Sequence, residues 1–420
     1  MKTARYRAFR CLSSGRQTVL PLLLLTILPF GCAGPPGAAN EERMDGRAET
    51  ATPESVDAGT VADGDAQAPC SEGGFCSTKL PVRRPLVAVA GSSADDVWAA
   101  GGDVIVHWDG SEWNVAYQYK VPTSTFFESI WVPRANDVWA LGNQLLVHYR
   151  VQAGLPPIIQ ELPLALAPSS LSGSTTHRGN WLTPNADALW AVRGQAPIQR
   201  FTEDPDGGMT AEGWSPALAS DSNARFTWVG IWGFSSDDVY VTGVGVSGLT
   251  NFGAIGHYDG NAWTITPFMD YRNGFRGVQG VKDAHGSKEL WVTPMTGDVT
   301  THLLRFTLGE DGSLGEPARK VPIPGAGRCI PGGDSSIFTS STDAWFSLGC
   351  LVHQLHEGEL AVRPLSPTGG SLGSIMGIWA SSADDVWVVG TAFAGDSDWL
   401  PASGFAVHRT KDSQQKGEQP

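Results

Sequence analysis

Short apolar runs separated by polar turns recur along most of this chain, and each run has the length of a β-strand. The turns are rich in Gly, Asp, Asn and Ser, which favour tight reversals of the backbone. Two runs end in an aromatic residue followed by Asp-Gly, at residues 108–110 and 258–260, and such Asp-Gly turns are typical of β-hairpins. The pattern predicts about four short antiparallel strands in each of several repeats.

One sequence unit recurs seven times and reads Asp-Asp-Val-Trp in its clearest copies, at residues 95–98 and 384–387. Its last residue is aromatic in every copy, and we call it the anchor. The anchors are Trp98, Trp139, Trp190, Tyr240, Trp291, Trp345 and Trp387. Successive anchors lie 41 to 54 residues apart, a period typical of the blades of a β-propeller.

We therefore predict an all-β, seven-bladed β-propeller over residues 80–410, with strands A to D in each blade counted from the central pore outward. A solenoid would show the same repeat count, but it needs terminal caps that this sequence does not contain. The seventh repeat stops after its third strand, near His408. Ring closure would supply the missing outer strand from the other end of the chain, and we expect residues 80–82 to form it.

The repeat resembles the blade repeats of uncharacterised bacterial outer-membrane lipoproteins and, more loosely, those of WD-repeat and kelch propellers. The resemblance covers residues 86–409. It implies the fold and supplies no catalytic residues.

The N-terminal region predicts export. Residues 1–31 have five basic residues and then an apolar run of about ten residues, the order of a secretory signal and too short to span a bilayer. The following Gly31-Cys32 resembles a lipobox, which implies lipid on Cys32 and an outer-membrane anchor; ordinary cleavage and secretion is the alternative. Residues 32–79 are acidic and poor in large apolar side chains, so we expect a disordered tether. Residues 411–420 form a polar tail.

Net charge bears on the possible partners, and the cysteines bear on the expected disulfides. Removing the five basic residues of the signal from the total of 29 leaves 24 against 43 acidic residues, a net charge of −19. Such a surface excludes nucleic acid as a partner and leaves the N-terminal lipid as the only membrane contact. In an exported protein the last four cysteines are expected to form disulfides. They allow three connectivities, of which the simplest is Cys70–Cys76 with Cys329–Cys350.

A histidine follows the anchor in six repeats: His107, His148, His257, His302, His353 and His408. We expect these imidazoles to pack on the anchors and bond a neighbouring backbone, and separate blades hold them too far apart to share a metal ion. The paired aspartates, such as Asp95 and Asp96, precede the anchor and are expected to cap backbone amides in the A–B turn. We predict no metal or cofactor site.

Long loops that do not repeat lie in the B–C and D–A connections, which emerge on one side of a propeller, here called the rim face. Aromatic and Arg side chains in such loops are typical of binding surfaces, although tolerated insertions are the alternative. The ligand-binding candidates are Asn251, Phe252, Asp270, Tyr271, Arg272, Phe275, Arg276, Asp396, Asp398 and Trp399.

The sequence thus favours a non-enzymatic binding or scaffolding module of the cell envelope, whose partner is an envelope protein or an extracellular polysaccharide. The alternative is a carbohydrate-active lyase or hydrolase that uses Asp270, Asp396 or Asp398. That chemistry needs two carboxylates facing each other at a fixed separation, and no motif predicts such a pair. A third hypothesis is a purely structural part of an envelope assembly.

Overall fold

A computed structural model of the chain describes residues 70–120, 127–142, 145–164, 178–206, 208–283, 285–294, 302–315, 317, 319–323, 336–338, 343–348, 351–366, 372–394, 398–411 and 413. The chain divides into two units, residues 1–64 and 65–420, and every described residue belongs to the second. Within those residues, no helix has the length and apolar character needed to cross a membrane. The expected signal and Cys32 lie outside the described residues.

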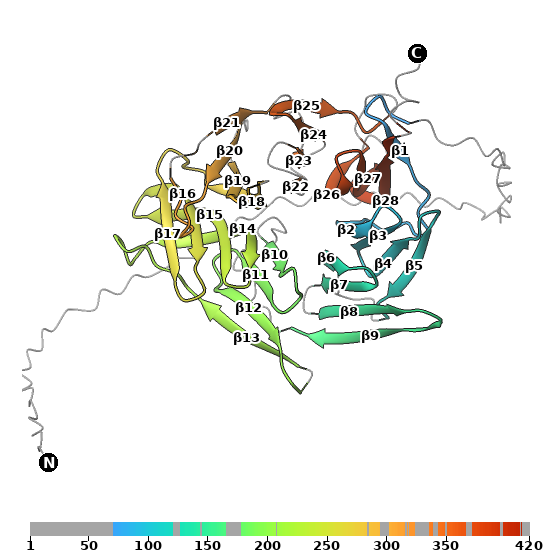
Figure 1. Cartoon of the computed structure of the whole chain (residues 1–420), viewed down its shortest axis with the longest axis horizontal. Coiled ribbons are helices and arrows are strands. Elements are labelled where there is room, and N and C mark those ends of the chain that lie inside the picture. Colours follow the sequence, from blue (N-terminus) through green and yellow to red (C-terminus); the bar gives the residue numbers. More distant parts are fainter. Residues whose placement is uncertain are drawn as a thin grey trace, which may run out of the picture. The chain divides into compact units, whose positions relative to one another are not determined.

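Across the described part of the chain, 28 strands form seven four-stranded antiparallel sheets arranged as blades around a ring (Figure 1). The expected all-β, seven-bladed β-propeller is therefore confirmed. Blade 1 consists of β2 (Ala88–Ser93), β3 (Asp96–Gly101), β4 (Val104–Trp108) and β5 (Trp113–Gln118), and blade 2 of β6 (Phe127–Arg134), β7 (Asp137–Gly142), β8 (Leu145–Gln152) and β9 (Leu155–Pro163). Blade 3 consists of β10 (Arg178–Leu182), β11 (Leu189–Arg193), β12 (Ile198–Glu203) and β13 (Met209–Trp214). Blade 4 consists of β14 (Arg225–Ser235), β15 (Asp238–Ser247), β16 (Thr250–Tyr258) and β17 (Trp263–Phe268).

The remaining blades follow the same meander, with one exception in the last. Blade 5 consists of β18 (Phe275–Lys282), β19 (Lys288–Pro294), β20 (His302–Thr307) and β21 (Arg319–Pro322). Blade 6 consists of β22 (Ser336–Phe338), β23 (Ala344–Leu348), β24 (Leu351–His356) and β25 (Glu359–Arg363). Blade 7 consists of β26 (Ser374–Ser382), β27 (Asp385–Ala394), β28 (Asp398–Arg409) and β1 (Phe75–Ser77). The exception is β1, which comes from the opposite end of the chain.

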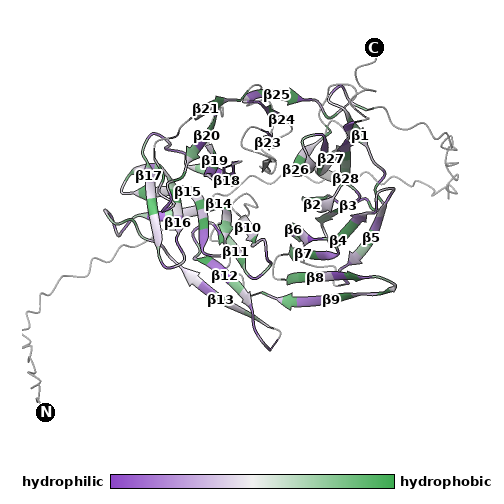
Figure 2. Cartoon of the chain, in the orientation of Figure 1, coloured by the Kyte–Doolittle hydropathy of each residue, from purple (hydrophilic) through white to green (hydrophobic). Residues whose placement is uncertain are grey.

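The core consists of clusters between neighbouring blades. All seven anchors lie in the second strand of their blade and all are buried, because strand B is paired on both edges and covered on both faces. The third strand of the next blade packs on the anchor: Tyr149 lies 5.4 Å from Trp98 and Trp108 lies 5.1 Å from Trp387, measured between ring centroids. Apolar residues accordingly recur along the strands of every blade (Figure 2).

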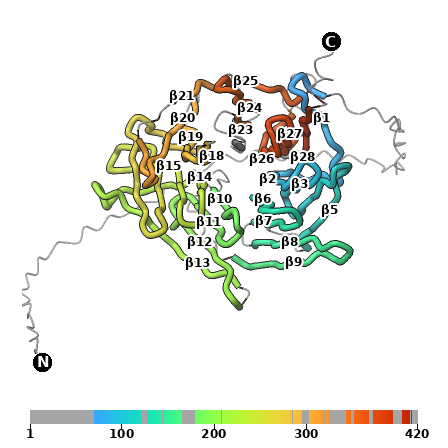
Figure 3. Tube along the Cα trace, in the orientation of Figure 1, coloured from blue at the N-terminus to red at the C-terminus, as the bar shows by residue number. Residues whose placement is uncertain are grey.

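The ring closes where the two ends of the described chain meet (Figure 3). Strand β1 pairs with β28 in the register Phe75 to Arg409, so an N-terminal strand completes the seventh blade as expected. The expectation that residues 80–82 form it is wrong, and the strand lies within the stretch assigned to the tether. The reason is packing: the Phe75 ring is buried against Trp345 of blade 6, whereas Leu80 and Val82 pack beside blades 1 and 7.

A disulfide holds this N-terminal strand in a small loop. The Cys70–Cys76 bond is confirmed, whereas Cys329 and Cys350 lie outside the described residues. We call residues 70–76 the clasp loop. Ser71 Oγ donates a hydrogen bond to the carbonyl of Pro364 after blade 6 at 2.7 Å, and Ser413 Oγ donates to the carbonyl of Gly74 at 2.6 Å. The clasp loop thereby joins the last two blades.

Candidate functional site

The recurring polar residues form one repeated unit around the anchor. In blades 1, 2, 4 and 7 the residue directly across from the anchor in the third strand is a histidine, and the two rings stack with centroids 3.7 to 4.3 Å apart. The imidazole Nε2 donates to the carboxylate two residues before the anchor over 2.5 to 2.9 Å. The four pairs are His107 with Asp96, His148 with Asp137, His257 with Asp238 and His408 with Asp385.

Stacking of histidine on the anchor is thus confirmed in these four blades, but the hydrogen-bond partner is a carboxylate and not the backbone. The second aspartate of each pair is likewise not a cap of backbone amides, because Asp96 accepts from His107, Trp98 Nε1 and Ser92 Oγ. Backbone capping belongs to the C–D turn, where Asp109 accepts from the amides of residues 111 and 112.

The other three blades place a different residue across from the anchor. Blade 5 has Arg305 and blade 3 has Arg200, while blade 6 has Gln354. The assignment of His302 and His353 to this position is therefore wrong: His302 precedes the facing Arg305 by three residues, and His353 precedes the facing Gln354 by one and lies across from Phe346. Arg305 forms a two-point ion pair with Glu289, with Nε at 3.0 Å from Oε2, so the longer base is matched by the longer acid.

Burial and hydrogen bonding have opposite effects on the pKa values of the groups in these pairs. Burial alone would raise the pKa of Asp96, Asp238 and Asp385, but the hydrogen bonds from histidine and its neighbours outweigh it, and the pKa of each falls below the usual value. Burial lowers the pKa of His148, against the opposing effect of Asp137. The recurring carboxylates and imidazoles therefore bond to one another as structural contacts of the fold.

Two of the candidates on the rim face belong to the core. Phe252 and Phe275 are fully buried, and each ring packs among the aromatic side chains of blades 3 to 5. The expectation that they contact a ligand is wrong. In β16 consecutive residues are buried from Phe252 onward, two residues from the hairpin tip, so that a phenylalanine next to an exposed Asn251 is still covered.

The remaining candidates of blade 4 lie together on the rim face. Asp270 and Arg272 are exposed, whereas Tyr271 and Arg276 are half-buried, and Tyr271 packs against Phe268 and Phe275. Their loop lies against the β15–β16 hairpin, because Gly274 contacts Val244 and Gly253 lies beside Tyr271. Ser247 Oγ also donates to Asp221 Oδ2 at 2.5 Å, which joins the preceding D–A loop to the same hairpin.

Two residues of this surface were missed from the sequence. Leu249, at the tip of the hairpin, is fully exposed, and Met269 is 56% exposed in the adjoining loop. Each could have been recognised in the sequence as an apolar residue inside a predicted turn, where polar residues are usual. We call Leu249, Asn251, Met269, Asp270 and Arg272 the blade-4 surface. On blade 7, Asp396 lies outside the described residues, and Asp398 and Trp399 lie in β28 with side chains that are not described.

Comparisons with known proteins bear on the fold. No family model and no curated protein matches the chain. Similar solved structures include YCF48 bound to D1 peptide, with a TM-score of 0.50 and 14% identity over 80% of this chain and 96% of that one. The β-propeller domain of Cps50 (Swd1) from Myceliophteria thermophila has a TM-score of 0.54 and 11% identity, covering 80% and 100% of the two chains. U3-55K has a TM-score of 0.51 and 9% identity, covering 81% and 99%.

At these identities the likeness shows the fold alone. The chain is a seven-bladed β-propeller.

Proposed function

We propose that this propeller is a non-enzymatic binding module that holds a protein partner on its blade-4 surface. The observation that carries the proposal is the full exposure of Leu249 at the tip of a hairpin that the Ser247–Asp221 hydrogen bond stabilises, together with the exposed Met269 in the loop after β17. Exposed apolar side chains gathered on one surface are typical of interaction sites, and Arg is among the residue types that dominate protein–protein binding energy. The peptide in the YCF48 structure supports a propeller of this shape as a peptide- or protein-binding scaffold.

The Asp–His and Glu–Arg pairs support a role without catalysis, because their side chains already satisfy one another inside the blades. We place the module at the cell envelope on the basis of the signal sequence, with lipid on Cys32 and an acidic tether. The matching test is fractionation: the natural chain should sediment with outer membranes, and Cys32→Ser should be released into the soluble fraction. Release of both would leave a secreted protein instead.

The binding proposal is tested by capture. The full-length chain would be immobilised and exposed to envelope extract, beside the double variant Leu249→Ser with Met269→Ser. The matched control is Leu155→Ser with Ile158→Ser, which removes two exposed apolar side chains, 64% and 40% exposed, from outer strand β9 of blade 2.

We expect one protein to be retained by the natural chain and by the control, and lost by the blade-4 variant. Equal retention by all three would remove the blade-4 surface from consideration. Retention that survives protease treatment of the extract would identify a polysaccharide partner and contradict the proposal of a protein.

A further inference from the structure

Blade 7 differs from the other blades at its outer edge. In blades 1 to 6 the third and outer strands are consecutive, so a C–D turn connects them on the face opposite the rim face. In blade 7 these strands are β28 and β1, which come from opposite ends of the chain, so no C–D turn connects them. An open cavity of about 620 Å³ lies between blades 7 and 1 on the same face. We call it the seam pocket, and its lining includes Asp95, Trp108, Asp384, His408, Thr410 and Lys411.

The carboxylates that line the seam pocket differ in whether another side chain already binds them. The carboxylate of Asp385, which also lines it, is bonded to His408 and Ser381, and Asp384 forms an ion pair with Arg409 at 3.7 Å. Asp95 is exposed and has no hydrogen-bond or ion-pair partner among the residues that the structure describes. A carboxylate in this position is available to a ligand.

Trp108 provides the aromatic wall. Trp108 is half-buried and lines the cavity, and its indole is held by Trp387 and Trp113, whose ring centroids lie 5.1 and 5.9 Å away. An aromatic face next to a carboxylate is a favourable environment for an organic cation, which gains from the ring quadrupole and from the negative charge.

We propose that the seam pocket binds the ammonium or guanidinium group of a Lys or Arg side chain on a partner protein. Charge complementarity argues for this occupant: of the three aspartates that line the cavity, Asp95 has no partner among the described residues, and the chain has a net charge of −14. The site is independent of the blade-4 surface, because it lies on the opposite face and uses blades 7 and 1.

The chain offers a matched control for this proposal. Asp237 occupies the same position of the A–B turn in blade 4 as Asp95 does in blade 1, and it lies against Gly260 as Asp95 lies against Gly110. Both side chains are exposed, so Asp95→Asn and Asp237→Asn make the same change in net charge without disturbing the core. Any general attraction of cations to an acidic protein is equal in the two variants.

The probe is a blocked tetralysine peptide, titrated calorimetrically into the full-length chain at low salt, with the side-chain-acetylated peptide as the uncharged comparison. We expect Asp95→Asn to weaken binding about fivefold, as loss of an exposed charge pair allows, and Asp237→Asn to change it by less than about twofold. Equal effects of the two variants, or equal binding of the acetylated peptide, would overturn the proposal.

A second variant acts in the opposite direction. Lys411 is an exposed cation at the edge of the seam pocket, and Lys411→Gln removes a charge that repels the probe. We expect tighter binding of the tetralysine peptide by this variant. An unchanged or weaker affinity would count against the seam pocket as the binding site.

Discussion

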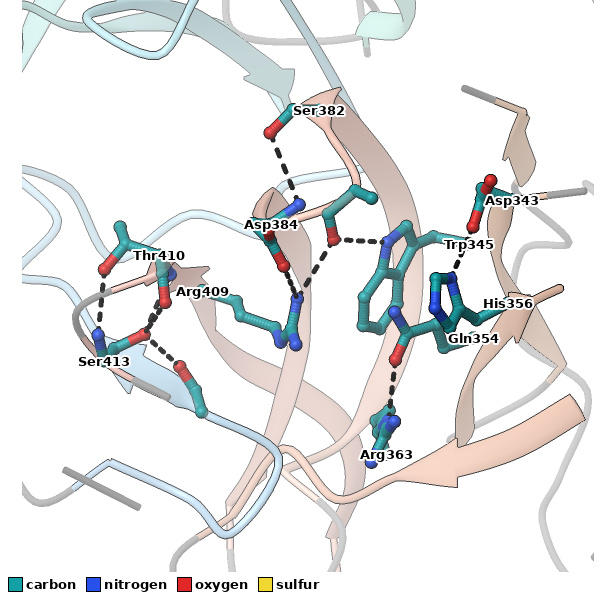
Figure 4. Close-up of polar contacts among 12 residues, drawn as sticks. Asp343, Trp345, Gln354, His356, Arg363, Ser382, Asp384, Arg409, Thr410 and Ser413 are labelled. Carbon is teal, nitrogen blue, oxygen red and sulfur yellow. Dashed lines mark hydrogen bonds and ion pairs between the residues drawn. The ribbon is translucent and has the colours of Figure 1, made fainter. Parts of the chain in front are cut away.

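The guanidinium of Arg409 lies 4.8 Å from the ring centroid of Trp345, the anchor of the sixth blade. At other junctions the equivalent residue is aromatic, as with Trp108 on Trp387. Arg409 is buried, and it donates to the carbonyl of Gly73 in the clasp loop at 3.1 Å and to the carbonyl of Ala383 at 3.0 Å. Figure 4 shows its guanidinium next to Asp384 and Trp345. One side chain therefore ties together the sixth blade, the seventh blade and the N-terminal strand.

Replacing Arg409 by leucine is expected to lower the free energy of unfolding by about 2–4 kcal/mol, because two buried carbonyls lose a charged donor and the cation–π contact is lost. Urea denaturation of the full chain measures this. The control is Arg84→Leu, which breaks an ion pair with Asp103 whose Arg side chain is 55% exposed. That change should cost less than about 1 kcal/mol. Equal effects of the two variants would mean that Arg409 does not hold the closure.

The Cys70–Cys76 disulfide is expected to stabilise the same closure. It fixes the clasp loop across a separation of six residues, and a loop of this size contributes about 2–3 kcal/mol by limiting the unfolded chain. The variant with both cysteines changed to serine should unfold at a lower urea concentration than the natural protein. Reducing agent should lower the midpoint of the natural protein at least to that of the variant, because it would also break the expected Cys329–Cys350 bond. A natural protein insensitive to reduction would contradict this role.

The repeat made the fold predictable, whereas the register within each blade was not. The anchors follow a recurring motif, so the blades could be counted from the sequence. The distance from anchor to facing residue is 9 residues for Trp98 and His107 but 17 for Tyr240 and His257. A histidine near the end of the third strand, such as His302 or His353, therefore need not face the anchor, and Arg305 and Gln354 face it in those two blades. The seam pocket was not predictable, because it brings residues near position 95 against residues near position 410 and depends on ring closure.

Acid is expected to weaken the blades through their Asp–His pairs. Burial favours a raised pKa for Asp385, but the hydrogen bonds from His408 and Ser381 outweigh it and the pKa lies below 3.8. A carboxyl group whose pKa is lower in the folded state stabilises the fold above the unfolded pKa, and this contribution is lost as the pH falls through the folded pKa. The free energy of unfolding should therefore decline below about pH 4.

Asp385→Asn is the variant that isolates this contribution. It should be less stable than the natural protein at neutral pH, and the difference should narrow as the pH falls below about 4, because the natural carboxylate becomes protonated there. Urea denaturation across this pH range compares the two proteins. A difference that stays constant down to the lowest pH would show that Asp385 does not act through its ionised form.

Glu289 and Arg305 form in blade 5 the pair that Asp and His form in four other blades, and the match of side-chain lengths is itself testable. Arg305→His and Glu289→Asp should each destabilise the protein by about 1–3 kcal/mol, because each leaves a shortened partner out of reach of a buried charge. The double variant recreates the Asp–His pair and should lose less stability than the sum of the two single losses, with a coupling energy of about 1 kcal/mol or more in a double-mutant cycle.

Glu289→Asp combined with His148→Gln of blade 2 is the control cycle, in which the two losses of stability should be additive because the two sites share no contact. Additivity in blade 5 as well would show that the acid and base of a blade are chosen independently, and that the repeated pairing does not stabilise the blade as a unit.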